Sequence, residues 1–242
     1  MSARRLAVLA GSVAIGQVGP AVTWLAPVRL AVWPRLAGIG RPGHLALTFD
    51  DGPDPIATPL FLAELDELGW KATFFVLGEQ VRRSPRLLDE IAAAGHEIGV
   101  HGDEHRYLIA RTPRAAADDL RRARDTVGDR FGHPPVWFRP PYGVLSGPAL
   151  VAARRLGLRP VLWTAWGRDW TRSATPQSVL DELGRGILSG GTAVLHDSDF
   201  HSAPGAWRSA LGALRPLAEE MSMRHVTVGP IAEHGIGGRR ER

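Results

Sequence analysis

The stretch His44-Leu-Ala-Leu-Thr-Phe49 is a short apolar run that is followed at once by Asp50-Asp51-Gly52-Pro53. The run predicts a buried strand, because a strand covered on both faces is apolar along its whole length. Gly52 and Pro53 end the strand, since proline cannot donate to a sheet ladder. Two carboxylates therefore stand at the carboxyl end of a strand, where α/β sheets collect their ligands.

Six further apolar runs follow this strand, and stretches with helical character separate them. The further strands are predicted at 72–77, 96–100, 135–138, 159–164, 192–195 and 225–228, and the helices at 59–68, 85–94, 113–130, 148–156, 176–188 and 204–220. Strands that alternate with helices predict a parallel sheet covered by helices.

Four of these helices share one start signal, a hydroxyl residue followed by proline. The hydroxyl can accept a hydrogen bond from a free amide of the first turn, and proline lacks only an N–H that would have had no partner. We therefore expect four capped helix starts, at Thr58-Pro59, Ser84-Pro85, Thr112-Pro113 and Thr175-Pro176.

Polar side chains follow five of the predicted strands directly. An open sheet concentrates its ligands at one switch point, whereas a barrel gathers loops from many strands onto one face. Contributions from five strands favour an incomplete (β/α) barrel over an open doubly wound sheet. The groups are Asp50-Asp51, the pair His101 and His105, Arg139-Pro-Pro-Tyr142, Arg168-Asp169-Trp170 and His196-Asp197.

Three of these residues have the chemistry of a metal site. Asp51, His101 and His105 supply one carboxylate and two imidazoles, and a catalytic divalent metal takes three protein ligands and keeps an open position. His101 and His105 are four residues apart, so one helical turn would aim both rings the same way. A surface coincidence of two histidines is the alternative, as is a turn-forming Asp-Asp-Gly-Pro that only caps a loop.

The composition excludes several classes of protein. The chain contains no cysteine, so it has no disulfide framework, thiolate metal site or cysteine nucleophile. With 44% hydrophobic and 22% charged residues it is not disordered, collagen-like or polytopic in a membrane. The net charge of +4 comes from arginines scattered along the chain. Nucleic-acid binding asks for a clustered basic face, so we expect no nucleic-acid partner.

Composition changes only at the ends of the 242 residues. We expect an apolar N-terminal segment with a linker at 1–42, one domain at 43–230 and a disordered basic tail at 231–242. Leu6 to Val28 carry no charge, and 23 such positions are long enough to span a bilayer. We expect a signal anchor or export signal that holds the protein at the cell envelope, outside the cytoplasm. An apolar helix lying against the domain is the alternative.

The order of the motifs resembles the polysaccharide deacetylase family, carbohydrate esterase family 4, whose shared unit is called the NodB homology domain. The resemblance covers about residues 43 to 230 and implies an incomplete (β/α)₇ barrel. Ala72-Thr-Phe-Phe-Val-Leu-Gly78 also looks like the second strand of that family. The ordered motifs are Thr48-Phe49-Asp50-Asp51-Gly52-Pro53, His101-x-x-x-His105, Arg139-Pro-Pro-Tyr142-Gly143, Asp169-Trp170 and Leu195-His196-Asp197.

The resemblance implies metal-dependent removal of acetyl groups from an N-acetylated glycan, either peptidoglycan or a chitin-like polymer. It makes Asp51, His101 and His105 the ligands of a divalent metal, usually Zn²⁺, with Co²⁺, Ni²⁺ or Mn²⁺ as alternatives. A water on this metal would attack the amide carbon, since a bound divalent metal lowers the pKa of its water.

The resemblance also implies a role for each remaining motif residue. The general base, its arginine partner and the general acid for the leaving amine would be Asp50, Arg139 and His196. The backbone N–H of Tyr142 would stabilise the oxyanion, and Trp170 and Leu195 would line the acetyl pocket.

Two positions depart from the family pattern. Gly102 stands where relatives usually carry Ser or Thr, whose hydroxyl orders the histidine loop, so we expect a looser metal site. Trp166 stands where many relatives carry an aspartate that supports the general acid. We predict that Asp169 takes that place beside His196, and that the pair acts in catalysis together.

Two alternatives to the hypothesis of an N-deacetylase remain open. The same site could remove the acyl group of an O-acetyl ester or a small amide. The chain could also be a non-catalytic, metal-bearing glycan-binding protein. In each case we expect a monomer.

Overall fold

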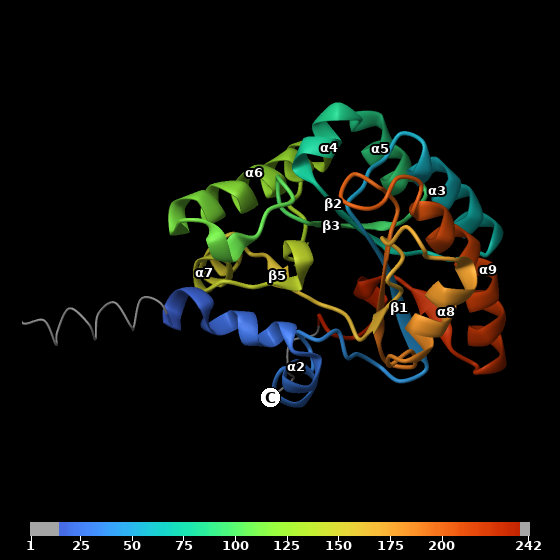
Figure 1. The fold of residues 1–242 in the computed structure, drawn as a ribbon. Helices are drawn as coiled ribbons and strands as arrows, with labels where there is room; N and C mark the ends of the chain where they lie inside the picture. The colour runs from blue at the N-terminus through green and yellow to red at the C-terminus, as the bar shows by residue number, and fades with distance from the viewer. Residues whose placement is uncertain (1–14, 238–242) are drawn as a thin grey trace, which may run out of the picture.

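The computed structural model describes residues 15–237, and its strands form one parallel sheet. The sheet has the order β5-β4-β3-β2-β1-β7-β6, and β8 pairs with the start of β1. The sheet curves into an open barrel with helices around it (Figure 1), which confirms the predicted incomplete barrel. The strands are β1 (His44–Asp50), β2 (Thr73–Val76), β3 (Glu97–Val100), β4 (Trp137–Phe138), β5 (Arg159–Pro160), β6 (Ala165–Trp166), β7 (Thr192–His196) and β8 (Thr227–Gly229).

The helices cover the outside of the sheet, and apolar side chains from both layers form the main core, with Phe49, Phe61 and Leu214 among them. The sequence missed α4, which follows β2 almost without a loop. The α-helices are α2 (Ala26–Val32), α3 (Ala57–Glu67), α4 (Gly78–Arg83), α5 (Pro85–Ala93), α6 (Pro113–Phe131), α7 (Gly147–Arg155), α8 (Pro176–Gly184) and α9 (Trp207–Met223). Short 3₁₀ turns are η1 (Gly19–Trp24), η2 (Leu108–Ala110), η3 (Pro141–Gly143) and η4 (Ile231–Glu233).

Only the first two residues of the predicted strand 159–164 lie in the sheet, and the rest of it spans the opening of the barrel. Its first residues form β5 beside β4, and the residues just after it form β6 beside β7 at the opposite edge. Between them, the carbonyl of Leu162 accepts a hydrogen bond from the Arg139 guanidinium and that of Trp163 from Arg29. Buried arginines thus satisfy backbone groups that no neighbouring strand reaches.

The segment before the predicted domain packs against this opening. The Leu162 N–H donates to the Leu36 carbonyl at 2.7 Å, and Arg29 of α2 is buried. In Figure 1 this blue segment lies along the side of the molecule that carries β5 and α7. No helix within residues 15–237 is long and apolar enough to span a bilayer. Arg4, Arg5 and the first nine residues of the predicted anchor lie outside the described residues.

The predicted disordered tail is wrong for residues 231–237. Ile231 and His234 are fully buried, and the Ile231 N–H donates to the Thr73 hydroxyl at 2.8 Å. The His234 carbonyl accepts from the N–H of Arg41 at 2.9 Å. Two apolar positions and a buried histidine outweigh the glycines and arginines that suggested disorder. The last five predicted tail residues lie outside the described range.

Two of the four predicted helix caps are confirmed. The hydroxyls of Thr112 and Thr175 accept from backbone amides at the starts of α6 and α8. The prediction is wrong for Ser84, whose side chain makes no cap bond, and for Thr58, which lies inside α3. Thr58 instead donates its hydroxyl proton to the buried carboxylate of Asp197 at 2.6 Å.

Candidate active site

Asp50 and Asp51 both line one pocket at the carboxyl end of the barrel. Asp50 is the last residue of β1, and neighbouring strand residues would normally point to opposite faces. Asp51 escapes this alternation because its φ is 76°, in the left-handed region that aspartate tolerates better than most residues. The turn directs both carboxylates to the same side.

His101 and His105 converge on Asp51, as predicted, but not through a helix. Residues 101–107 form a loop, so the expected helical turn is wrong. The Nε2 atoms of His101 and His105 lie 3.5 and 3.3 Å from Asp51 Oδ1. One ligand atom from each of the three side chains lies within 4.8 Å of the others.

The protonation states of these groups suit a divalent cation. Burial lowers the pKa of both histidines far below the ordinary value, so the rings are neutral at pH 7 and can offer lone pairs. His101 donates Nδ1–H to the Arg139 carbonyl at 2.9 Å, which leaves Nε2 free to bind a metal. Among the described residues, the buried Asp51 Oδ1 has no hydrogen-bond partner. Burial raises the pKa of Asp51 to about 7, a penalty that a bound cation would offset.

Asp50 is held by a buried arginine on the side away from the metal ligands. Arg139 Nη1 lies 2.8 Å from Asp50 Oδ1 and 2.6 Å from the Thr48 hydroxyl. Its guanidinium also lies 4.2 Å from the ring centroid of Phe75. The guanidinium and the Asp50 carboxylate thus form a buried ion pair. Asp50 Oδ2 is 3.9 Å from His101 Nε2, so it faces the ligand cluster.

His196 is gripped by Asp169 through two hydrogen bonds. Its Nδ1–H donates to Asp169 Oδ1 at 2.9 Å, and its backbone N–H donates to Oδ2 at 2.7 Å. Burial lowers the pKa of His196, but the charges of Asp169, Asp51 and Asp50 outweigh burial and raise it to about 10. The carboxylate beside His196 is therefore Asp169, as the sequence predicted. The bond at Nδ1 leaves Nε2 as the ring atom able to deliver a proton.

These observations agree with the comparisons with known proteins. A sequence profile described as polysaccharide deacetylase matches residues 38–161, which is more than half of the chain. The chain belongs to the polysaccharide deacetylase family.

Named relatives of this polysaccharide deacetylase cover most of its length. A peptidoglycan-N-acetylglucosamine deacetylase of Bacillus cereus is 31% identical over 193 residues, which are 78% of this chain and 88% of the relative. A chitooligosaccharide deacetylase of a Bradyrhizobium species is 34% identical over 168 residues, 69% of this chain and 75% of the relative. The crystal structure of a peptidoglycan N-acetylglucosamine deacetylase in complex with 4-naphthalen-1-yl-N-oxidanyl-benzamide is 25% identical. It matches with a TM-score of 0.75 over 85% of this chain and 93% of that one.

Three tryptophans line the deacetylase pocket, and the sequence predicted only one of them there. Trp170 lines the pocket as predicted, and Trp166 stacks on it at 4.4 Å between ring centroids. Trp166 thus replaces the family aspartate with apolar surface. Trp163 lies 5.4 Å from Trp166 and also lines the pocket of about 140 Å³.

Leu195 does not reach this pocket. It is fully buried in the core between sheet and helices, and Val194 lines the pocket instead. Side chains alternate along β7, so only one of the two neighbours can point inward. The prediction of Leu195 as a pocket residue is therefore wrong.

The sequence also missed His201, which lies outside every motif. Its ring stacks on His105 at 4.2 Å between centroids, while Tyr142 packs against His105 at 4.4 Å. His201 and Tyr142 both line the pocket. No spacing signal marks His201, because its loop has no regular structure that would relate it to the other histidines.

Proposed function

We propose that this deacetylase hydrolyses the N-acetyl groups of a cell-wall or chitin-like glycan. One observation carries the proposal. Asp50, which pairs with Arg139, lies in the same pocket as the possible metal ligands Asp51, His101 and His105. His196, which pairs with Asp169, lines that pocket as well. Hydrolysis of an amide needs a base, an acid and a polarised carbonyl, and this pocket offers a group for each.

Asp51, His101 and His105 would hold the metal, and we propose Zn²⁺ because one carboxylate and two imidazoles form a donor set typical of catalytic zinc. When bound, a divalent metal polarises the acetyl carbonyl and makes a water acidic near neutral pH. The neutral histidines support this donor set, as does the buried Asp51 Oδ1, which has no hydrogen-bond partner within residues 15–237.

Asp50 would take the proton of the attacking water. Its Oδ1 is occupied by Arg139, so Oδ2 is the atom that faces the pocket and remains available. Arg139 fixes the orientation of the carboxylate through a charge-assisted hydrogen bond. The same salt bridge satisfies the buried guanidinium.

His196 would give its proton to the leaving amine. An amine leaves poorly unless it is protonated, and Asp169 stabilises the imidazolium form that can donate. Tyr142, at the turn after β4, would present its backbone N–H to the developing oxyanion. Trp170 would pack against the acetyl methyl.

The decisive experiment compares the wild type with His105→Ala and with the control His133→Ala, a histidine on the exposed surface. We expect wild type and control to hold one metal per chain and to release acetate from peptidoglycan or chitin oligomers. His105→Ala should lose metal and acetate release together. Full metal occupancy in His105→Ala would contradict the ligand set. A metal-loaded wild type that releases no acetate from either glycan would contradict the activity.

We further propose that the chain is held at the outer face of the cell membrane by its N-terminal segment. The first 49 residues contain no acidic residue, and Trp24, Leu25 and Trp33 are 49, 49 and 41% exposed. Exposed tryptophans together with arginines are typical of a membrane interface. Trp24→Ser with Trp33→Ser should weaken sedimentation with phosphatidylglycerol vesicles, whereas the control Ile187→Ser should not.

For the domain boundaries, we propose that residues 43–230 form the catalytic unit and that residues 15–42 and 231–237 pack against it. The hydrogen bonds from Leu162 to Leu36 and from Arg41 to His234 support this division. Removal of 15–42 would leave the opening of the barrel uncovered.

A further inference from the structure

Both histidine ligands lie on a loop, so something must fix the backbone that carries them. His101 is held at two points, because its N–H donates to the Val76 carbonyl at 2.8 Å and its ring to the Arg139 carbonyl. His105 is not held in this way, since its buried Nδ1 has no hydrogen-bond partner among the described residues. Apart from ring contacts, the position of His105 depends on the backbone of residues 102–104.

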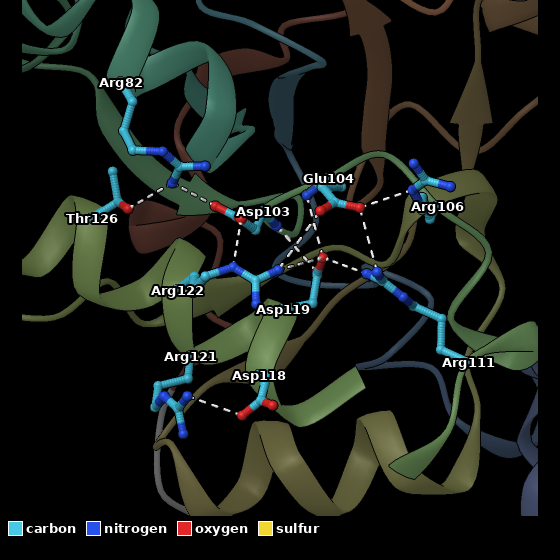
Figure 2. Close-up of polar contacts among 10 residues, drawn as sticks. All are labelled: Arg82, Asp103, Glu104, Arg106, Arg111, Asp118, Asp119, Arg121, Arg122 and Thr126. Carbon is cyan, nitrogen blue, oxygen red and sulfur yellow. Dashed lines mark hydrogen bonds and ion pairs between the residues drawn. The ribbon is translucent and has the colours of Figure 1, made fainter. Parts of the chain in front are cut away.

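The buried carboxylate of Asp119 binds that backbone directly. Asp119 lies on α6, and its side chain is fully buried. Its Oδ2 accepts the N–H of Asp103 at 3.1 Å, and its Oδ1 accepts the N–H of Glu104 at 3.3 Å. Figure 2 shows Asp119 pointing up from α6 into the loop, with Arg111 on its far side. Arg111 donates to Oδ1 at 2.8 Å, which compensates the buried negative charge.

The opposite side of the same loop is held by α4. The N–H groups of Gly78 and Glu79 donate to the carbonyls of Gly102 and Asp103, both at 3.1 Å. The Asp103 side chain is gripped by Arg82 at 2.6 Å and by Arg122 at 2.7 Å (Figure 2). The two peptide groups that join residues 102, 103 and 104 are therefore held on both sides, by α4 and by Asp119.

Gly102 is the residue that makes room for this clamp. Its φ is +94°, and a Cβ placed there would lie 2.9 Å from Asp119 Oδ2. A side chain at this position would therefore force the Asp119 carboxylate or the loop to shift. The sequence predicted a looser loop because Gly102 lacks a hydroxyl, whereas the structure gives the loop a carboxylate from a different element.

We propose that Asp119 is a positioning residue for the metal site, which it serves by setting the backbone that directs His105 toward Asp51. The inference rests on the proposed metal centre and adds to it a residue outside every motif. An asparagine at 119 keeps the shape but only one acceptor oxygen, so at least one of the two loop amides loses its partner. Supporting residues of metal ligands typically change metal affinity by about 10- to 100-fold.

The test compares Asp119→Asn with Asp118→Asn, the preceding acid on the same helix. Asp118 pairs with Arg121 at 2.9 Å and has no bond to the loop (Figure 2), so it controls for the loss of an acid from α6. Zn²⁺ affinity is measured by chelator competition, and the Co²⁺-loaded proteins are compared by visible absorption. We expect Asp119→Asn to bind Zn²⁺ about 10- to 100-fold more weakly and to change the Co²⁺ spectrum. Asp118→Asn should match the wild type, and excess Zn²⁺ should restore turnover to Asp119→Asn.

A second pair of variants keeps the proposal testable if Asp119→Asn does not fold. Gly102→Ala places a methyl group against Asp119 Oδ2, whereas Gly132→Ala adds one at a similar φ of +71° with nothing within 4 Å. We expect only Gly102→Ala to weaken Zn²⁺ binding and to alter the Co²⁺ spectrum.

The possible failures are distinguishable. A wild type that binds no metal overturns the proposed function and this inference with it. A wild type that binds tightly, with Asp119→Asn or Gly102→Ala binding equally tightly and giving the same Co²⁺ spectrum, overturns the inference alone.

Discussion

Asp50 and Asp51 are neighbours in the sequence but are held in different ways. Asp50 ends an extended strand and pairs with Arg139, whereas Asp51 takes a left-handed turn and faces two imidazoles. The left-handed backbone of Asp51 thus gives the two neighbouring carboxylates different surroundings. Asp50 has a cationic partner, Arg139, whereas Asp51 faces two neutral imidazoles. This difference is the reason that we propose Asp50 as the base and Asp51 as the metal ligand.

Asp50→Asn tests that assignment at the scale of one residue. Asparagine keeps the shape of the side chain but cannot accept a proton, so metal content should stay at the wild-type value. Turnover should fall by about 10² to 10⁴, the usual contribution of a positioned base. Elemental analysis and acetate release measure the two effects. Loss of metal in Asp50→Asn, with retention in Asp51→Asn, would mean that the two roles are reversed.

The alkaline limb of the pH–rate profile tests the His196–Asp169 pair. Asp169 is the strongest of the influences that raise the pKa of His196, against the opposing effect of burial. Asp169→Asn should therefore lower that pKa, so His196 loses its proton sooner and the alkaline limb moves to lower pH. Metal content and melting temperature should be reported beside kcat at each pH. Activity reduced evenly at every pH, with an unmoved limb, would show that Asp169 only shapes its loop.

At the scale of elements, a start signal predicts a helix better than it predicts a cap. All four hydroxyl-proline pairs lie at or near a helix start, yet only Thr112 and Thr175 place the hydroxyl on an amide. Thr58 binds Asp197 instead, because the partner comes from a distant strand end that the local sequence cannot show. The split of 159–164 has the same origin. Its residues have strand propensity, but the sequence does not show that this stretch connects the two edge strands of the sheet, β5 and β6.

The caps give a stability prediction with a matched control. Thr175 forms a reciprocal capping box with Ser178, so Thr175→Ala should lower the free energy of unfolding by about 1 kcal/mol. Ser84→Ala at the start of α5 should change it far less, since the Ser84 side chain makes no cap bond. Urea denaturation of both variants measures the difference. Equal losses would indicate that intrinsic helix propensity, not capping, sets the effect.

At the scale of the whole molecule, the gathering of the predicted residues in one pocket was predictable because five strands deliver their ends to one face. Asp51, His101 and Arg139 directly follow β1, β3 and β4, and His196 is the last residue of β7. Parallel strands in a barrel bring their carboxyl ends together. The supports of that face were not predictable, since Asp119 reaches the site from the surface of a helix. The packing of residues 15–42 and 231–237 against the domain was not predictable either. The barrel surface that these segments contact exists only once the strands have assembled.

The surface beside the pocket predicts how a polymer would lie. A groove of about 880 Å³ adjoins the active site, and His105, Tyr142 and His201 line both. In this groove the rings of Tyr107 and Tyr142 stack at 3.8 Å between centroids, and Tyr107 is 49% exposed. An exposed aromatic ring next to polar side chains suits a sugar face, and we expect only a substrate of several units to reach Tyr107 from the pocket.

Tyr107→Ala should therefore raise KM for long N-acetylated oligomers while it leaves KM for the shortest cleavable oligomer unchanged. Ring stacking contributes about 0.5–1.5 kcal/mol, which corresponds to a roughly two- to tenfold rise in KM. Tyr107→Phe keeps the ring and is the control, so it should behave as the wild type with every substrate. The measurement is the ratio of KM values for a hexamer and a dimer in the three proteins. A rise of equal size for both lengths would mean that Tyr107 acts by supporting Tyr142 at the reaction centre, and the glycan would then leave the pocket on another side.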